Sequence, residues 1–158
     1  MLFLHATATA GEGEDSITTG MSYDQDYLTG EPAGHGFGVH LGYHHGLADD
    51  WDLLVNGGYA VFLGPGTRHD RVSLVVGAAY VIDALTWIPR FHAGVGYFGP
   101  GVKGVVLPDF GVTAGFGLEY RRFREFGVGI KAEYRYLVRN RHRSDGGLTV
   151  DLFVAAYF

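Results

Sequence analysis

Hydrophobic residues alternate with other residues along most of this chain, most clearly in its last twelve positions. Every second residue from Leu148 to Phe158 is apolar, whereas the positions between them include Thr149 and Asp151. Successive side chains of a β-strand point to opposite faces, so a period of two indicates a strand. The pattern therefore predicts a strand over Gly147–Phe158 with one wholly apolar face.

The same alternation predicts seven further strands, which makes eight. Six of them are Gly36–His45, Trp51–Val61, Val72–Asp83, Pro89–Phe98, Phe110–Arg121 and Phe126–Tyr136.

The first strand is ambiguous. We prefer Leu2–Ala10, because its apolar core of Leu2 to Leu4 is shorter than the ~7–15 residues of a signal peptide. The alternative is a truncated signal followed by a first strand at Ser16–Tyr23.

The connections between these strands are expected to alternate in length. Segment 11–34 carries six acidic residues and no basic one, so we interpret it as a solvated loop or extended hairpin tip. Long and short connections then follow in turn along the chain. This layout is typical of an up-and-down membrane barrel with its termini in the periplasm and its longer loops outside.

The polar faces of the predicted strands are rich in glycine, including Gly36, Gly94, Gly115 and Gly127. Glycine suits the crowded axis of a narrow barrel better than an exposed strand face. The apolar faces carry aromatic residues at both ends and aliphatic residues between them, as expected for girdles at two membrane interfaces. Candidate girdle residues are Trp51, Tyr80, Trp87, Tyr120, Tyr134 and Tyr136. We predict an all-β protein, an eight-stranded antiparallel up-and-down transmembrane β-barrel, in one domain over residues 1–158.

Composition narrows the candidate chemistry. The chain has no cysteine, which excludes disulfides and thiolate metal sites, and its net charge of −5 gives no support for nucleic-acid binding. No apolar run reaches the ~18 residues of a membrane-spanning helix. We expect no cofactor and no metal.

Charged residues on the polar faces are expected to fill the barrel interior as a network of ion pairs, because buried charges need partners. The predicted network is Asp52, Asp83, Arg90, Glu119, Arg121, Lys131, Glu133, Arg135 and Asp151, with His40, His44 and His92 as polar filler. Turn lengths suggest that Asp83 faces Arg90, that Arg135 faces Asp151 and that His44 faces Asp52. Two interpretations stay open: a structural plug, or a narrow hydrated path gated by the network.

Two motifs near the C-terminus carry a family resemblance. Gly117-Leu-Glu-Tyr120 and Lys131-Ala-Glu-Tyr-Arg-Tyr136, followed by the strand that ends on Phe158, resemble the last three strands of small OmpA-like outer-membrane surface proteins. The resemblance implies an integral protein of the bacterial outer membrane, with Phe158 as the targeting end recognised by the barrel-assembly machinery.

The segment before the last strand is basic. Arg139, Arg141 and Arg143 are candidates for binding lipopolysaccharide phosphate, for capping the barrel mouth against the acidic first loop, or for plain solvation. His142-Arg-Ser144 resembles the His-x-Ser pair of outer-membrane lipid A deacylases. In that family the pair lies on a strand and Asn follows the serine, whereas Asp145 follows here.

The sequence thus predicts a structural or surface-interaction protein in contact with membrane lipid and lipopolysaccharide. The alternatives are a small low-conductance pore and a lipid A-modifying enzyme, and we expect no enzymatic activity.

Overall fold

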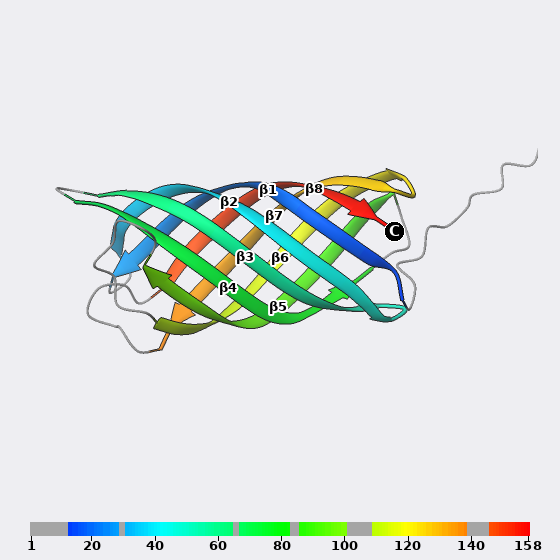
Figure 1. Cartoon of the computed structure of the whole chain (residues 1–158), viewed down its shortest axis with the longest axis horizontal. Coiled ribbons are helices and arrows are strands. Elements are labelled where there is room, and N and C mark those ends of the chain that lie inside the picture. Colours follow the sequence, from blue (N-terminus) through cyan, green and yellow to red (C-terminus); the bar gives the residue numbers. More distant parts are fainter. Residues whose placement is uncertain (1–12, 29–30, 65–66, 83–85, 101–108, 139–145) are drawn as a thin grey trace, which may run out of the picture.

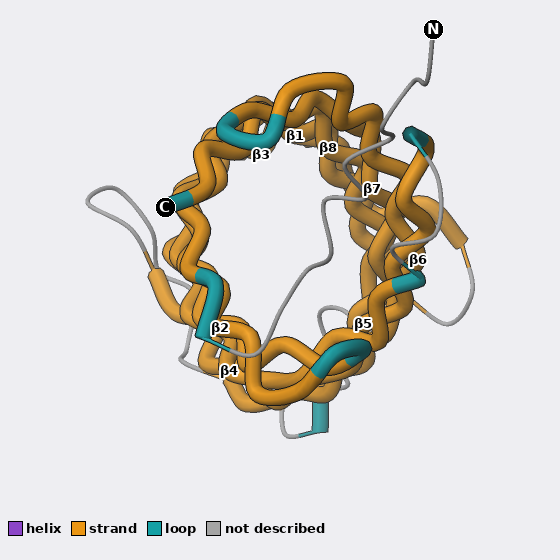
Figure 2. Tube along the Cα trace, turned by 90° about the vertical axis from the view of Figure 1, so that its right-hand side faces the viewer, coloured by secondary structure: helices purple, strands orange, loops and turns teal. Residues whose placement is uncertain are grey.

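A computed structural model describes residues 13–28, 31–64, 67–82, 86–100, 109–138 and 146–158. Each strand pairs antiparallel with the next one in the sequence, and β1 pairs with β8 to close the barrel (Figures 1 and 2). The strands are β1 (Asp15–Leu28), β2 (Glu31–Ala48), β3 (Trp51–Gly64), β4 (Thr67–Val81), β5 (Trp87–Pro100), β6 (Asp109–Phe123), β7 (Phe126–Leu137) and β8 (Gly146–Tyr157). The predicted fold class is confirmed. None of the described residues form a helix long and apolar enough to cross a membrane.

The first strand differs from the preferred prediction. It covers Asp15–Leu28 and so includes the strand of the alternative prediction, Ser16–Tyr23. Segment 2–10, which that alternative interprets as a truncated signal, lies outside the described residues. The interpretation of segment 11–34 as a loop is also wrong. Asp24 and Asp26 are buried in the barrel, where they face basic partners, so an acidic stretch without local bases could still form a strand.

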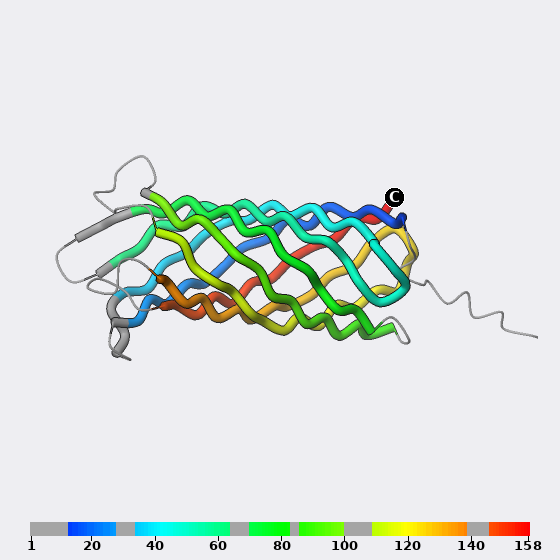
Figure 3. The backbone as a smooth tube through the Cα atoms, turned by 90° about the horizontal axis from the view of Figure 1, so that it is seen from below, coloured from blue at the N-terminus to red at the C-terminus, as the bar shows by residue number. Residues whose placement is uncertain are grey.

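The strands extend further at one end of the barrel than the sequence predicted. Only residues 29–30 separate β1 from β2, and only 65–66 separate β3 from β4, because the flanking strands continue as hairpins (Figure 3). We call this the loop end. The opposite turn end holds the start of β1, the C-terminus, and the connections β2–β3, β4–β5 and β6–β7.

The strand registers fix the dimensions of the barrel. A path across the pairs from Ser16 through His44, Leu54, Gly77, Gly94, Thr113, Arg135 and Gly147 returns to β1 at Asp26, a shear of ten residues. Eight strands with this shear tilt by ~40° and enclose a backbone radius of ~8 Å. Such a barrel has room for side chains and little else.

The outer wall is apolar, as the alternation predicted. Phe37, Leu41, Val95 and Leu152 each expose more than half of their side-chain area. The structure places Trp51, Tyr80 and Trp87 at the turn end, where Trp51 contacts Tyr80 and Trp87 contacts Tyr120, with ring centroids 5.3 and 4.9 Å apart. Tyr97 contacts Phe110 at the loop end, and Tyr134 and Tyr136 are exposed there too.

The distance between the two aromatic girdles matches the thickness of the apolar part of a membrane. On β6, Phe110 and Tyr120 are ten residues apart, which corresponds to ~25 Å along the barrel axis at this tilt. That is the height of the apolar band of outer-membrane barrels.

We predict that Leu152→Arg destabilises the barrel through its position on this wall. Leu152 is 65% exposed and lies midway along β8, so a charge there would face the bilayer centre and lower the free energy of unfolding by ~2–4 kcal/mol. Urea unfolding in phospholipid vesicles measures the change. Leu47→Arg is the matched control, since Leu47 is 52% exposed at the turn end and the expected cost near an interface is ~0–1 kcal/mol. Equal costs at the two positions would contradict the membrane orientation.

Candidate functional site

The candidate site is the barrel interior, where glycine makes space for charged side chains. A Cβ built on Gly127 would collide with the Glu119 carboxylate, and one on Gly20 would lie 2.7 Å from the His40 ring. The glycines of the polar strand faces therefore leave room for long side chains from neighbouring strands.

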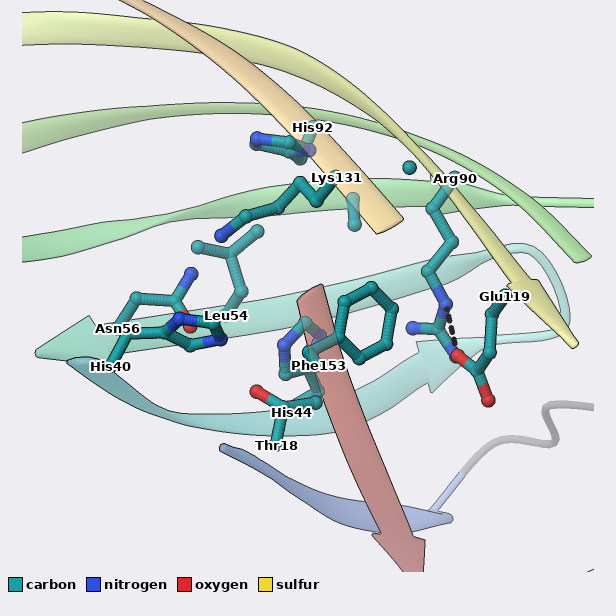
Figure 4. Close-up of a pocket in the computed structure, with 12 residues that line it drawn as sticks. Thr18, His40, His44, Leu54, Asn56, Arg90, His92, Glu119, Lys131 and Phe153 are labelled. Carbon is teal, nitrogen blue, oxygen red and sulfur yellow. Dashed lines mark ion pairs between the residues drawn. The ribbon is translucent and has the colours of Figure 1, made fainter. Parts of the chain in front are cut away.

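Arg90 is the centre of a cluster near the turn end, which we call the lower cluster (Arg90, Asp52, Glu119, Tyr157, Arg121 and Glu14). Its guanidinium bonds to Asp52 on β3 at 3.0 Å. It forms an ion pair with Glu119 on β6 at 3.1 Å (Figure 4). It also donates to the hydroxyl of Tyr157 on β8 at 2.6 Å. That hydroxyl donates in turn to Glu119 at 2.6 Å.

Arg121 completes the lower cluster. Its guanidinium lies 3.9 Å from the centre of the Tyr157 ring and 3.2 Å from the carboxylate of Glu14, just before β1. These contacts connect five strands across the lumen at this end: β1, β3, β5, β6 and β8. Glu119 is almost completely buried among them, with 1% of its area exposed.

A second group, the upper cluster (Asp24, Asp26, Arg71 and Arg135), lies in the lumen toward the loop end. Arg71 on β4 and Arg135 on β7 both bond to Asp26 on β1, at 3.0 and 2.6 Å. Asp24 lies 3.6 Å from Arg71 and accepts a hydrogen bond from Thr149 on β8 at 2.7 Å. All four charged residues are buried.

Aromatic rings support both arginines of the upper cluster. Arg71 lies over Phe62 at 4.2 Å from the ring centre, and Arg135 lies over Phe98 at 5.2 Å. A guanidinium stacked on an aromatic face is held in a fixed plane, so these contacts orient the arginines toward the aspartates.

Between the two clusters each ion pair joins strands that lie only one or two places apart in the ring. Lys131 bonds to Asp151 on the adjacent strand at 2.9 Å, His40 lies 3.5 Å from Asp151, and His92 bonds to Glu133 at 3.0 Å. Two small cavities lie in the remaining lumen, one of about 40 Å³ toward the turn end and one of about 60 Å³ toward the loop end. The residues His40, Asn56 and Lys131 line both, so the cavities meet at this level (Figure 4).

The structure brings most of the predicted network into the lumen. Asp52, Arg90, Glu119, Arg121, Lys131, Glu133, Arg135 and Asp151 all make the contacts described above, and Asp83 lies outside the described residues.

The predicted pairings are wrong. Arg90 faces Val81, Arg135 faces Gly147, and His44 faces Leu54. The turn centres lie up to two residues from the assumed positions, and a bulge near Gly46 shifts the β2–β3 register by one residue, which leaves His44 two residues from its assumed partner. Each error is an even number of residues, so every side chain keeps its predicted face. The ion pairs then form with other partners, often on distant strands.

Sequence reasoning missed several interior residues. Asp24 and Asp26 were assigned to a loop, Arg71 precedes the predicted start of its strand, and Tyr157 was placed on the mixed face without a role. A usable pattern exists: Ile17, Met21 and Tyr23 alternate with polar residues, and continuing this period brings both aspartates inside.

The interior histidines do not form a metal centre. Within the part of the chain that the structure describes, no three His, Asp or Glu side chains lie close enough together to hold a metal ion. His40 and His92 contact carboxylates, and His44 lines the cavity toward the turn end. Arg139, Arg141, Arg143 and the His142–Ser144 pair lie outside the described residues.

One polar contact lies on the outer wall at the turn end. Tyr43 donates to the carboxylate of Asp15 at 2.6 Å, and His45 lies 2.7 Å from the same oxygen. Asp15 is the first residue of β1, and these two hydrogen bonds lower the pKa of its carboxyl group. Its backbone also pairs with Phe158, so the cluster joins β2 to the seam where the barrel closes.

Solved structures with this architecture are known. No protein-family model and no curated protein sequence matches the chain. Among solved structures, Neisserial surface protein A superposes with a TM-score of 0.74 at 15% identity, over 93% of this chain and all of that one. The outer-membrane protein OprG of Pseudomonas aeruginosa gives 0.72 at 10% identity, over 96% and 98% of the two chains.

The chain has the fold of a small outer-membrane β-barrel. The resemblance suggested by the C-terminal motifs is confirmed at this level. Ail, the attachment invasion locus protein of Yersinia pestis, has the same fold, with a TM-score of 0.60 at 18% identity over 92% and 98% of the chains. The outer-membrane enzyme PagL also shares it, with a TM-score of 0.57 at 17% identity over 90% and 98%. The fold therefore occurs in enzymes as well as in surface proteins.

We predict that Arg90→Gln strongly destabilises the barrel. The substitution leaves the carboxylates of Asp52 and Glu119 buried without their cation, and breaking a buried ion pair in this way costs ~3–5 kcal/mol. Urea unfolding in vesicles measures the loss. Arg122→Gln is the control, because Arg122 is exposed and the expected change is within ~0.5 kcal/mol. A loss below 1 kcal/mol for Arg90→Gln would show that the lower cluster contributes little to stability.

Proposed function

We propose that the protein is an integral barrel of the bacterial outer membrane with a structural or surface-interaction role and a closed interior. The observation that carries this proposal is the pair of clusters that join distant strands across the lumen. Asp26 on β1 is bonded to Arg71 on β4, and Tyr157 on β8 to Arg90 on β5. In each case the two strands lie three places apart in the ring of eight.

Such clusters oppose the passage of ions. A permeating ion would have to displace short charge-assisted hydrogen bonds between buried groups, which are among the strongest polar contacts in proteins. The two clusters act in series, since one lies on each side of the cavities. The protein then presents its extended hairpins at the loop end to the outside of the cell.

The proposed orientation in the membrane rests on the two longest connections, β5–β6 and β7–β8, which join strands at the loop end. Short turns face the periplasm in outer-membrane barrels and the longer connections face outward. The barrel-assembly machinery is the proposed partner during insertion, with the terminal strand ending on Phe158 as the recognised segment. Phe158 is 69% exposed on the outer wall, beside the first residue of β1.

The basic segment before β8 is the proposed contact for lipopolysaccharide. It holds Arg139, Arg141 and Arg143 at the loop end, where the lipid A phosphates of the outer leaflet would lie. Guanidinium groups bind phosphate through paired hydrogen bonds. A lipid A-modifying activity is not proposed, and release of a 3-hydroxy fatty acid from lipopolysaccharide by the purified barrel would contradict this.

A small pore is the second candidate. It is favoured by one observation: the two cavities meet at His40, Asn56 and Lys131, and the ion pairs at this level join strands only one or two places apart. If the clusters opened together, the cavities would form a path through the barrel.

We predict that the purified barrel shows no channel openings in planar bilayers and that neutralising a single cluster does not open it. Arg135→Gln leaves Arg71 bonded to Asp26, and the lower cluster is unchanged. Asp151→Asn affects neither cluster directly, because Asp151 pairs with Lys131. Only a combined variant that disrupts both clusters, Arg71→Gln with Arg135→Gln and Arg90→Gln, is expected to conduct.

Channel activity in either single variant would favour the gated pore over the plug. Liposome swelling with a small sugar is the complementary measurement. Heat-modifiable migration on a detergent gel verifies that each variant is folded, so that a silent record from an unfolded protein is not counted as closure.

We predict that Arg139→Gln with Arg141→Gln and Arg143→Gln reduces the lipopolysaccharide that copurifies with the barrel. The three substitutions remove the proposed phosphate contacts but leave the strands intact. The content of 3-hydroxy fatty acids, which lipopolysaccharide carries and phospholipids lack, measures the change in the purified protein. The control is Arg122→Gln with Arg124→Gln at the turn end, which faces the other leaflet. An unchanged lipopolysaccharide content in the triple variant would contradict the assignment.

A further inference from the structure

The two shortest hairpin ends at the turn end differ in charge. The β2–β3 turn holds Asp49 and Asp50. The end of β6 and the two residues that follow it, Arg122–Glu125, hold two arginines and one glutamate, and we call this segment the β6–β7 turn. Their strands are four places apart in the ring of eight, so the two turns lie on opposite sides of the rim (Figure 1). The rim is therefore acidic on one side and carries a net positive charge on the other.

The arginines of the β6–β7 turn are exposed and do not serve the lumen. Arg121, one residue earlier, is buried against Tyr157 and Glu14. Arg122 and Arg124 are exposed, and neither makes an ion pair or ring contact with the residues that the structure describes. Phe123 between them is 65% exposed. A phenylalanine open to solvent between two unpaired cations is not explained by packing within the barrel.

The height of this turn relative to the aromatic girdle suggests its environment. Arg122 follows Tyr120, whose ring contacts Trp87, by two residues in β6, and the strand pairing has a bulge between Tyr120 and Phe123. Two residues correspond to ~5 Å along the axis at this tilt. Tyrosine and tryptophan lie at the headgroup level of a membrane. The guanidinium groups then lie where lipid phosphates lie, and Phe123 can contact the lipid surface.

We propose that Arg122, Phe123 and Arg124 form a binding site for an anionic phospholipid of the inner, periplasm-facing leaflet. The two guanidinium groups bind the headgroup phosphate, because their paired N–H donors match the spacing of the phosphate oxygens. Phe123 packs against the lipid near the glycerol. The single carboxylate of Glu125 leaves the turn with one net positive charge. The acidic β2–β3 turn repels the same headgroup, so the site occupies one side of the barrel.

This inference rests on the proposed insertion in a membrane. It adds that the annular lipid is not uniform: a negatively charged headgroup is enriched beside β6 and β7 and depleted beside β2 and β3.

The two tryptophans of the chain provide the test. Trp87 pairs with Tyr120 beside the basic turn, and Trp51 follows the acidic turn directly. The variants Trp51→Phe and Trp87→Phe each leave a single fluorophore on one side of the rim. Each variant is reconstituted in phosphatidylcholine vesicles with a fraction of phosphatidylglycerol. In one sample the phosphatidylcholine carries bromine, and in the other the phosphatidylglycerol carries it at the same acyl position. The brominated lipids of the two samples therefore differ only in their headgroup.

The quenching of Trp87 by brominated phosphatidylglycerol is expected to correspond to a local fraction of this lipid about fivefold above its bulk fraction. This is the enrichment that one arginine near an anionic lipid surface provides. Trp51 is expected to show no enrichment or a deficit. Arg122→Gln with Arg124→Gln should remove the difference at Trp87, whereas Asp49→Asn with Asp50→Asn should leave Trp87 unchanged. High salt should weaken the enrichment, since the site is exposed.

Equal quenching of Trp87 by the two brominated lipids would overturn the site, and so would an enrichment that persists in the double arginine variant. Failure of either brominated lipid to quench either tryptophan has a different meaning: the barrel is not inserted, and the proposed function fails first. Heat-modifiable migration confirms that every variant is folded before its fluorescence is compared.

Discussion

The dominant constraint on this molecule is that lipid supplies no hydrogen bonds to the backbone or to polar side chains. Each N–H and C=O group within the bilayer needs a partner inside the protein, and a closed sheet satisfies this requirement without an edge. Closure of β1 on β8 then divides all side chains into an outer and an inner set. The outer set has to be apolar, so every charge carried by the strands within the bilayer is directed to the axis.

Crowding at the axis explains the composition of the inner set. A barrel of eight strands with a shear of ten residues has a radius of only ~8 Å, so long side chains fit only beside glycines. The contact of Gly127 with Glu119 is one case. Charges compressed into this space must be paired, and the pairs reach across the lumen because facing strands lie within the length of two side chains.

The alternation of apolar and polar residues was sufficient to predict seven strands, the number of strands in the barrel and the inward direction of eight charged residues from Asp52 to Asp151. It was insufficient for the first strand, because the charges of Asp24 and Asp26 look like a loop until their partners on β4 and β7 are known. Partner identity depends on register and shear, and these depend on turns that shift by one or two residues without changing the pattern. The sequence pattern placed Arg90 on the correct face of its strand. Its hydrogen-bond partner Tyr157 lies 67 residues further along the chain, and no local pattern identifies that partner.

Tyr157 lies on the last strand to be synthesised, and its hydroxyl bridges Arg90 and Glu119. Until β8 meets β1, this bridge is missing, Arg121 lacks its ring and Glu14 is not yet in place. A partly assembled sheet would thus have charged side chains without partners along its unpaired edge, next to lipid. Intermediates with seven strands inserted are penalised, so joining the two ends of the sheet and assembling the polar interior become one cooperative event late in biogenesis.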